Sequence, residues 1–362
     1  MKQFHRKVST LLFISGLICN LQAQILDHSW EKIVYTSDES WFASVEAKMI
    51  AGNVLLYQRN IGGWPKNIQI QNPLTDDEKQ NLLEQKSIPE GCTTDNGATI
   101  LEMTYLSKIY KQVPDERYKK AFLLAINYLL DAQYNNGGWA QFYPLHKGYY
   151  THTTYNDDSM VNIMKLLSEI FNKTGYFSIE PDEIAIIRAK KAFDKGIDCI
   201  LKTQYKQHGV LTSWCAQHDE HTLLPAKARS YELPSLSGQE SAGIVLLLMS
   251  LDNPSTQVKN AINSAVAWFE KTKITGLRQE RYLTETGLRE KRLLPDPSAP
   301  PLWARFMELE DNAPFFCDRD GIKKASMFEI GQERRNGYGW YSEQPQKVLD
   351  LYPAWKTKWD NN

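Results

Sequence analysis

The stretch Gly137-Gly138-Trp139 recurs in this chain, and each copy lies between helical patterns. An earlier copy reads Gly62-Gly63-Trp64-Pro65, a looser one runs from Gly209 to Trp214, and Gly337-Tyr338-Gly339-Trp340 follows near the C-terminus. Recurring turns of this kind indicate helix pairs arranged as a repeat. The period is longer than in most helical solenoids and the copies are irregular. We therefore predict a closed toroid of helical hairpins and not an open array.

Helical periodicity on either side of these turns supports the same architecture. Apolar residues recur at i, i+3 and i+4 in two clear segments: Phe122, Ala125, Ile126, Leu129 and Leu130, then Met160, Ile163, Met164, Leu167 and Ile170. Further helical patterns with polar N-terminal residues cover residues 41–50, 95–110, 182–205, 239–251 and 255–271. Alternating strand patterns are scarce and short. The chain is predicted to be all-α, with long irregular loops and a few short strands.

The helical pattern weakens beyond about Arg278. Residues 294–301 are rich in proline and cannot form a continuous helix. Aromatic residues follow closely, namely Trp303, Phe306, Phe315, Phe316, Tyr338, Trp340 and Tyr341. This C-terminal segment is therefore predicted to pack onto the toroid, so that residues 24–362 form one domain.

Composition and the N-terminus limit the class of protein. The 362 residues carry 42 basic and 43 acidic side chains, a balance that gives no overall preference for nucleic acid or anionic membranes. Basic residues 2–7 precede an apolar run from Val8 to Leu21, which is short for a membrane span. We predict a secretory signal peptide over residues 1–23, cleaved near Ala23, and a secreted or periplasmic monomer.

The cysteines that follow this signal are widely spaced and include no CxxC pair: Cys92, Cys199, Cys215 and Cys317. A zinc site is poorly supported by such spacing. Export permits disulfides, but the sequence requires none. We predict buried free thiols that act as small apolar groups.

Acidic residues stand at the starts of two predicted helices. Asp95 precedes one apolar helical run, and Asp157 and Asp158 precede another. Helix capping or complementation of the helix dipole would account for each acid alone. Together, Asp95 and Asp157 at the ends of neighbouring hairpins would suit Ca²⁺, whose oxygen coordination is flexible and can be completed by water and a substrate carboxylate.

Arginines in irregular segments form the second candidate group. Arg229 lies in a stretch that proline interrupts, and Arg305, Arg319 and Arg334 occur among aromatic residues. A guanidinium pairs bidentately with carboxylates and stacks on aromatic rings, a combination that suits an acidic sugar chain. Each of the last three could instead be a salt-bridge partner of a nearby acid.

The chain resembles the pectate lyases of polysaccharide lyase family 10 from about residue 30 to its end. The resemblance rests on several blocks in the same order: Tyr57-Gln58-Arg59 with residues 62–67, Asp95-Asn96-Gly97-Ala98-Thr99, residues 137–144, Tyr155-Asn156-Asp157-Asp158, and residues 228–238. Any one block would be weak evidence, but the ordered set is specific.

This resemblance implies an (α/α)3 toroid whose groove binds polygalacturonate, and a Ca²⁺-dependent anti β-elimination that leaves an unsaturated uronate. By motif, Asp95 and Asp157 are expected as calcium ligands and Arg229 as the catalytic base. Substrate-binding roles are expected for Arg305, Arg319, Arg334 and Tyr231. Arginine is an unusual base because its guanidinium stays protonated at ordinary pH. Either its pKa is lowered by neighbouring cations and desolvation, or hydroxide acts with its assistance.

Departures from the family pattern are modest. Ile61 stands where a small or polar residue is more usual, and residues 151–154 form a less apolar lead-in than expected. These differences leave the proposed catalytic positions intact and allow a changed subsite preference. His152 in this lead-in is interpreted as a structural loop histidine, with substrate contact as the alternative.

Two other functions remain compatible with the sequence. A helical-toroid glycoside hydrolase acting on uronic-acid oligosaccharides would use two carboxylates, for which Asp95 and Asp157 could be mistaken, and would form no double bond. A non-catalytic acidic-sugar-binding protein would keep the aromatic residues but lack the base, and the presence of Arg229 argues against it.

Overall fold

A computed structural model describes residues 28–174 and 178–359 of the chain. The predicted signal peptide lies outside the described residues. Two compact units are present, and each is described by itself: one comprises the described residues up to Asp131 with Glu169–Arg188, and the other comprises Ala132–Ser168 and the described residues from Ala189 onward. The prediction of one domain over residues 24–362 stays a prediction.

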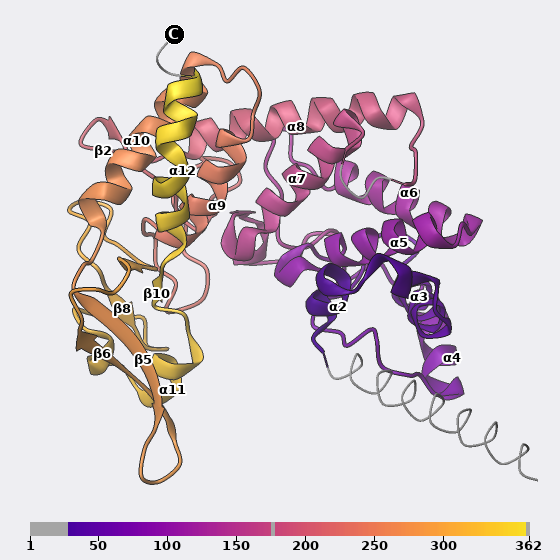
Figure 1. Ribbon diagram of the computed structural model, residues 1–362, viewed down its shortest axis with the longest axis horizontal. Coiled ribbons are helices and arrows are strands. Elements are labelled where there is room, and N and C mark those ends of the chain that lie inside the picture. Colours follow the sequence, from indigo (N-terminus) through magenta and orange to yellow (C-terminus); the bar gives the residue numbers. More distant parts are fainter. Residues whose placement is uncertain (1–27, 175–177, 360–362) are drawn as a thin grey trace, which may run out of the picture. The chain divides into compact units, whose positions relative to one another are not determined.

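The first unit is built from helices that pack around α5. Its elements are α2 (Trp30–Thr36), the 3-10 helix η1 (Glu39–Ala43), α3 (Val45–Tyr57), α4 (Asp76–Gln85), the 3-10 helix η2 (Asp95–Gly97), α5 (Ile100–Gln112) and α6 (Glu116–Asp131). Helix α5 contacts α2, α3 and α6 (Figure 1). The polar side chains of Ser44 and Thr75 cap α3 and α4, and Thr75 forms a reciprocal capping box with Glu78.

The second unit contains most of the remaining helices and all strands of the described residues. In chain order it adds η3 (Tyr149–Thr151), β1 (Thr153–Thr154), η4 (Asn156–Asp158), α7 (Ser159–Asn172), α8 (Glu183–Thr203), β2 (Lys206–Gln207), β3 (Val210–Leu211), β4 (Gln217–His218), α9 (Gly238–Met249), α10 (Thr256–Thr272), β5 (Leu277–Leu283), β6 (Arg289–Pro295), β7 (Trp303–Ala304), β8 (Phe316–Cys317), β9 (Lys323–Lys324), η5 (Met327–Glu329), α11 (Gln332–Gly337), β10 (Tyr341–Ser342) and α12 (Gln344–Trp359). Helices α7 and α8 also contribute residues to the first unit. The strands pair two by two and antiparallel, so the described residues contain no larger sheet.

The helices that the sequence predicted agree closely with the structure, except where a single residue leaves the helical conformation. The helix expected over 95–110 is broken into η2 and α5, because Asn96 and Thr99 adopt φ angles of 53° and 67°. Such left-handed conformations cannot continue a right-handed helix. The helix expected over 41–50 is likewise divided at Ser44, which caps α3.

Three glutamines fix three successive helical hairpins in the same way. Each side-chain amide donates one hydrogen bond to a carbonyl of the following turn and one to an alanine carbonyl of a later helix (α6, α8 or α10), over 2.8–3.0 Å: Gln58 to Gly62 and Ala121, Gln133 to Gly137 and Ala192, Gln204 to Thr212 and Ala261. Since these bonds satisfy backbone groups at helix ends and turns, they define the repeat.

The Gly-Trp turns complete this repeat. Trp64, Trp139 and Trp214 are buried and equally spaced along the chain, and the indoles of Trp64 and Trp214 each donate to a carbonyl of the preceding helix at 2.8 Å. The fourth turn, which ends at Trp340, also lies between helices, since α11 precedes it and α12 follows it. The Trp340 indole likewise donates to a carbonyl of the preceding helix, that of Arg334, but Trp340 belongs to a separate aromatic core and breaks the equal spacing.

That aromatic core confirms that the C-terminal segment packs as a structured part of its unit. It comprises Tyr231, Phe306, Phe315, Phe316, Cys317, Met327, Ile330 and Trp340. Helix α12, drawn in yellow in Figure 1, contacts α9 and α10. The sequence pattern did not indicate α12, because prolines at 345 and 353 lie within it.

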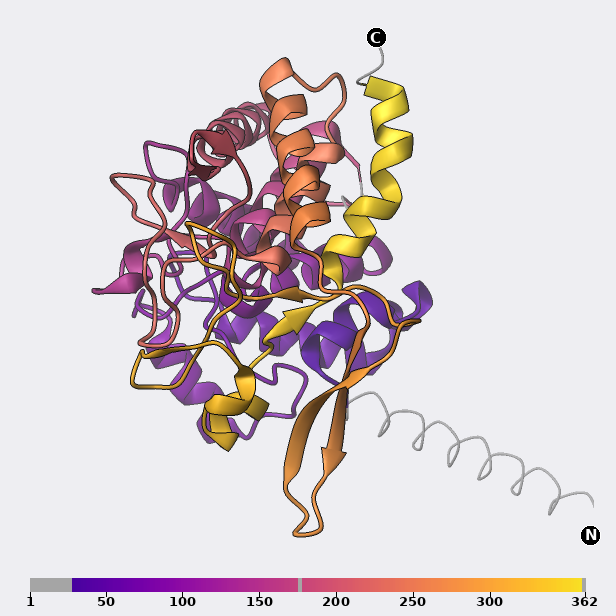
Figure 2. The ribbon, with the colours of Figure 1, turned by 90° about the vertical axis from the view of Figure 1, so that its left-hand side faces the viewer.

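Strands β5 and β6 differ from the expectation of short strands only. They pair over seven residues each, from Leu277 opposite Pro295 to Leu283 opposite Arg289. Helix α11 contacts β6, and the tip of the hairpin projects beyond the helices of its unit (Figure 2). Charged cross-strand partners obscure the usual apolar alternation. Arg292, for example, pairs with Glu280 and lies over the ring of Tyr282 at 4.8 Å.

Two further sequence predictions can be compared with the described residues. Their cysteines, Cys92, Cys199, Cys215 and Cys317, are all free and buried, as predicted. Burial raises the pKa of the Cys92 thiol to about 12, which keeps this thiol protonated. None of the described helices combines the length and apolar character required to cross a membrane.

Candidate functional site

Three arginine side chains gather around one aromatic ring in the second unit. The guanidinium carbons of Arg305, Arg334 and Arg229 lie 4.6, 5.5 and 5.8 Å from the centre of the Tyr338 ring. Like charges repel, so this grouping requires either anionic partners in the protein or an anionic ligand. The sequence predicted each arginine separately, and the structure brings these three together.

Arg229 is held by a carboxylate three residues away. Its Nε donates to Oε2 of Glu232 at 2.7 Å, Nη2 donates to Oε1, and its backbone N–H donates to Oε2 at 3.1 Å. The hydrogen bonds from Arg229 to Glu232 raise the pKa of the guanidinium above its ordinary value, although burial acts in the opposite direction. Arg229 is therefore a firmly protonated cation in this structure, and 45% of its side chain is exposed.

Glu232 is the buried centre of this arrangement. It also accepts a hydrogen bond from the Tyr338 hydroxyl at 2.7 Å. Burial opposes its ionisation, but the bonds from Arg229 and Tyr338 outweigh burial and lower its pKa. Glu232 therefore stays ionised and orients both neighbours.

Arg305 is almost completely buried between loops and α9. Its Nη2 donates to Oδ1 of Asn156 at 2.9 Å and to Oε1 of Glu240 at 3.1 Å, and it lies 3.6 Å from Oδ1 of Asp157. Its Nε is buried without a hydrogen-bond partner among the described residues. Burial opposes the charge of Arg305, but Glu240 and the other nearby acidic groups raise its pKa above the usual value.

Arg334 and Arg319 share one carboxylate but differ in exposure. Nη2 of each donates to Oε1 of Glu333, at 3.2 and 3.0 Å, and the side chain of Arg334 is 7% exposed while that of Arg319 is 65% exposed. Nε and Nη1 of Arg334 are buried without partners among the described residues. Tyr231 is buried, and its ring lies 4.4 Å from the Arg334 guanidinium and 5.0 Å from that of Arg229. The Tyr231 ring therefore packs against both guanidinium groups.

Asp157 lies beside Arg305, at the N-terminal side of α7. Its φ of 52° turns the chain sharply within η4, its Oδ2 accepts a hydrogen bond from Asn156 at 2.7 Å, and 40% of its side chain is exposed. The neighbouring Asp158 is half-buried and packs against Gly243. Burial raises the pKa of Asp158 to about 6, and Glu240 and Asp157 add to this rise while Lys165 opposes it.

Asp95 belongs to the first unit and is held by a cation of the protein. Its side chain is 6% exposed, and Oδ2 accepts a hydrogen bond from the Lys66 ammonium. The turn that follows contains Asn96, with a positive φ, and the Asn96 amide donates to Asn67 at 2.9 Å. A joint calcium site of Asp95 and Asp157 stays a prediction.

The surroundings of Asp157 fit a hard cation. Asp157 offers a partly exposed carboxylate, and Asp158 and Glu240 add negative charge. The Asn156 amide oxygen is occupied by Arg305, which also lies 3.6 Å from Asp157 Oδ1. Oxygen donors of this kind suit Ca²⁺. Asp95 fits with one condition, since the Lys66 ammonium would have to be exchanged for the metal.

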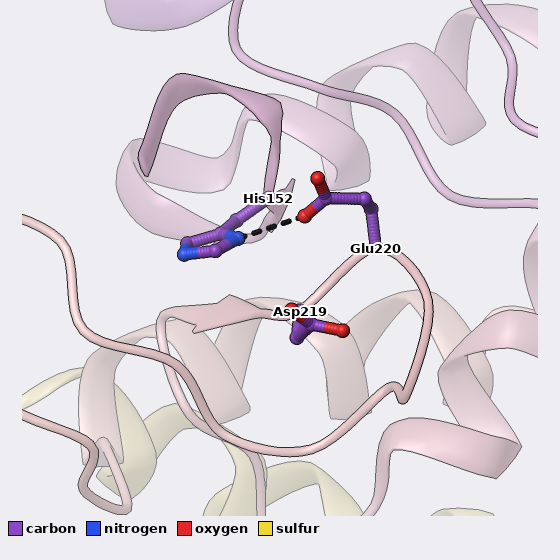
Figure 3. Close-up of side chains that lie close together, drawn as sticks. All are labelled: His152, Asp219 and Glu220. Carbon is purple, nitrogen blue, oxygen red and sulfur yellow. Dashed lines mark hydrogen bonds and ion pairs between the residues drawn. The ribbon is translucent and has the colours of Figure 1, made fainter. Parts of the chain in front are cut away.

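A second acidic cluster, which the sequence did not predict, surrounds His152. Figure 3 shows His152, Asp219 and Glu220, whose possible ligand atoms lie within 4.8 Å of one another. His152 Nδ1 is 2.9 Å from Oε2 of Glu220, and Asp219 Oδ1 accepts hydrogen bonds from residues 221 and 222 at 2.7–3.0 Å. These contacts join two loops, in agreement with a structural role for His152.

Sequence reasoning missed the groups that organise the arginines. Glu232, Glu240, Asn156 and Tyr338 make the contacts that fix Arg229 and Arg305. Only Glu232 had a local signal, because it follows Arg229 by three residues. The other partners come from distant parts of the chain, as with Arg305 and Asn156, which are 149 residues apart.

Comparisons with known proteins place these features in a family. The pectic acid lyase family model matches residues 58–349. A point mutant of a family 10 polysaccharide lyase from Cellvibrio cellulosa, in complex with trigalacturonic acid, has a TM-score of 0.72 at 35% identity, over 87% of this chain and 95% of that chain. A second structure of a family 10 polysaccharide lyase from Cellvibrio cellulosa has the same TM-score and sequence identity, and the match covers 87% of this chain and 94% of that chain.

A search of curated proteins finds no match. The structural similarity confirms the predicted fold class, the (α/α)3 toroid with few short strands. With a family match over most of its length and 35% identity to solved family 10 enzymes, the chain belongs to the pectic acid lyases of polysaccharide lyase family 10.

Proposed function

We propose that this polysaccharide lyase is a pectate lyase, which cleaves de-esterified polygalacturonate by Ca²⁺-dependent anti β-elimination and releases 4,5-unsaturated oligogalacturonides. The observation that carries this proposal is the group of Arg229, Arg305 and Arg334 around Tyr338, with Asp157 3.6 Å from Arg305. Polygalacturonate presents one carboxylate per sugar, so a group of fixed cations matches its charge.

The proposed reaction breaks two bonds and forms one double bond. Arg229 in its neutral form accepts the C5 proton of a galacturonate, the C5–H electron pair forms the C4=C5 double bond, and the C4–O4 bond breaks. The leaving oxygen takes a proton from water, and the hydroxide so formed takes the proton from Arg229, which restores the neutral base. Charge develops on the uronate carboxylate as the C5 proton leaves, so cations placed before the reaction lower the barrier.

Calcium would be held by Asp157 together with Asp95. When bound, it would neutralise the uronate carboxylate and acidify the C5 proton. Arg305 is fixed in place by Asn156 and Glu240, so it can bind a second carboxylate oxygen without reorganisation. The exposed Arg319 would bind a neighbouring sugar. Arg334 and Tyr231 are proposed to contribute to substrate binding as well, with the Tyr231 ring packed against the Arg334 guanidinium.

The protonation state of Arg229 leads to a pH prediction. If Arg229 itself accepts the proton, Glu232→Gln removes the carboxylate that raises its pKa, so a larger fraction of Arg229 is neutral at any given pH. The rise of kcat/KM with pH should therefore begin at lower pH in this variant. The profile is measured at saturating calcium, with Glu333→Gln as the matched control. An unshifted profile would identify hydroxide as the proton acceptor.

Calcium dependence gives a separate prediction. Asp157→Asn removes a charged oxygen ligand while keeping the size of the side chain, so the calcium concentration for half-maximal activity should rise at least about tenfold. The measurement is a calcium titration of the initial rate. The matched control is Asp350→Asn, which alters a carboxylate on α12 and should leave the titration unchanged. Equal calcium requirements for both variants would remove Asp157 from the proposed site.

One assay separates the three candidate functions. Purified protein is incubated with polygalacturonate, with calcium or with chelator, while the ultraviolet absorbance of the unsaturated product is followed. Calcium-dependent absorbance supports the lyase. New reducing ends without absorbance would support a uronic-acid glycoside hydrolase, and binding without either product would support a sugar-binding protein.

Cellular location and assembly follow from the same proposal. Polygalacturonate is too large to be an intracellular substrate before cleavage, and the basic and apolar N-terminus matches a signal peptide cleaved near Ala23. We propose a secreted or periplasmic monomer. N-terminal sequencing of the exported protein tests the cleavage point.

A further inference from the structure

A cationic cavity of about 660 Å³ lies in the first unit, among α3, α4 and α6. Five basic side chains line it, while no carboxylate does: Arg59, Lys79, Lys86, Arg117 and Lys120. Apolar groups, including Met49, Leu56 and Leu124, form part of the wall. Its volume is within the range of small-molecule sites, roughly 300–1,000 Å³. The cavity therefore combines cations with an apolar surface.

Arg59 is the buried cation of this cavity. The residue is 9% exposed, and its Nη2 donates to Oε1 of Gln85 at 2.7 Å. Its Nε and Nη1 are buried without a hydrogen-bond partner among the described residues. Buried polar groups are nearly always paired in folded proteins, so two unpaired donors on one charged side chain indicate a missing acceptor.

The other basic side chains of the cavity add positive charge around Arg59. Lys86 donates to the carbonyls of Leu55 and Gln58, and burial, together with the charge of Arg59, lowers the pKa of Lys86. Lys79 and Arg117 have acidic partners in Asp76 and Asp115, but Lys120 makes no ion pair within the described part of the chain. An anion in this cavity would relieve the repulsion between Arg59 and Lys86.

The internal repeat shows that the fold does not require an arginine at this position. The backbone N–H of Arg59 donates to Gly63 at 3.0 Å, and the N–H groups of Tyr134 and Tyr205 make the same bond in the next two hairpins at 2.9 Å. Tyrosine therefore satisfies the same backbone geometry twice in this chain. Arg59 is a local departure from the repeat, which favours a role beyond folding.

The third hairpin also contains a groove at the equivalent place, but with different chemistry. That cavity of about 320 Å³ includes Asp198 with Lys202 and Lys206, so its charges are mixed. Gln257 and Asn260 line it where Arg117 and Lys120 line the first cavity. A groove is thus a consequence of the hairpin architecture, whereas the concentration of positive charge is specific to the first hairpin.

We propose that the cavity around Arg59 binds a small organic carboxylate, with Arg59 as the anchoring cation and the apolar wall against the body of the ligand. The unpaired Nε–H and Nη1–H of Arg59 lie on opposite edges of the guanidinium, so each can donate one hydrogen bond to an acceptor, and the buried positive charge favours a carboxylate as that acceptor. The carboxylate can come from a uronic-acid sugar or from another organic acid, and the two sources are separated by the choice of probe.

The test is isothermal titration calorimetry of the mature protein in calcium-free buffer, with trigalacturonate, citrate and the neutral trisaccharide maltotriose. Arg59→Tyr introduces the residue that the other hairpins use. It should weaken the binding of at least one carboxylate probe about tenfold or more. Arg117→Gln combined with Lys120→Asn, both at exposed positions, should weaken the same binding without affecting the fold. Maltotriose should not bind in an Arg59-dependent manner.

The matched control is Lys206→Gln in the third hairpin, which should leave these titrations unchanged. Loss of an Arg59-dependent component of trigalacturonate binding alone identifies a uronate ligand, because the arginines around Tyr338 still bind this probe. Weakened citrate binding, with or without that loss, identifies a more general organic-acid site. Superimposable titrations of the natural protein and Arg59→Tyr would overturn the proposal, as would an equal effect of Lys206→Gln. Cleavage of polygalacturonate by Arg59→Tyr is measured in parallel, so this test is independent of the proposed lyase activity.

Discussion

Replacement of Arg229 by alanine is expected to abolish elimination, with a loss in kcat of about 10² to 10⁴-fold or more, the range for a positioned proton-transfer group. Binding of oligogalacturonide should remain measurable, because Arg305 and Arg334 are held by other residues. The measurement combines the initial rate of unsaturated-product formation with calorimetric binding of trigalacturonate. Arg229→Ala also leaves Glu232 with its remaining bond from Tyr338.

Two control variants make this result specific. Arg319→Ala removes an exposed guanidinium, so it should change KM more than kcat. Arg229→Lys keeps a positive charge but loses the planar pairing with Glu232, and it should recover only a small part of the activity. Near-normal turnover by Arg229→Ala would contradict the assignment of Arg229 as base.

The second large effect is expected on folding. Gly137→Ala should destabilise the protein by more than about 3 kcal/mol, because it adds a backbone clash to an unfavourable φ. Gly137 has a φ of +95°, and a Cβ there would lie 2.0 Å from the carbonyl oxygen of Lys195. Movement of Gly137 would disturb the hydrogen bond from Gln133 to its carbonyl, and movement of Lys195 on α8 would disturb the bond from Gln133 to Ala192. Urea unfolding measures the change in the free energy of unfolding.

Gly148→Ala is the matched control, because it tests the cost of a positive φ without a steric clash. Gly148 has nearly the same φ, +94°, but a Cβ there would meet no atom within 4 Å. With ψ at −155°, Gly148 lies in a backbone region that is essentially limited to glycine, so the substitution should cost roughly 1–3 kcal/mol from conformation alone. Similar unfolding midpoints for Gly137→Ala and Gly148→Ala would show that the close approach to Lys195 is not rigid.

Local sequence patterns predicted most helices because their apolar faces repeat every three to four residues. The ends of α8, α9 and α10 lie within two residues of the predicted limits. Prediction was poorer where a single residue changes the backbone, as at Asn96 and Thr99, whose positive φ angles interrupt the helix expected over 95–110. Such conformations depend on tertiary contacts, for example the bond from the Trp64 N–H to the Thr99 hydroxyl at 3.1 Å.

The sequence predicted the arginines of the candidate site but not the side chains that bind them. Arg229, Arg305 and Arg334 were identified by residue type and motif, and the structure brings them to one ring. Their carboxylate partners could not be assigned from the sequence, because pairs such as Arg305 and Glu240 are 65 residues apart. The raised pKa of Arg229 depends on one of these partners, Glu232, so the protonation question arises only from the folded structure.

The three glutamine bonds also bear on how the chain reaches its fold. Each joins residues of similar sequence separation, 63 for Gln58 and Ala121, 59 for Gln133 and Ala192, and 57 for Gln204 and Ala261. A hairpin can therefore close as soon as its own second helix has left the ribosome, before the next hairpin has been synthesised. Loop-closure entropy grows only slowly with length, so the three closures have similar entropic costs. If the hairpins close one after another from the N-terminus, only one hairpin at a time exposes apolar helix surface that has not yet packed.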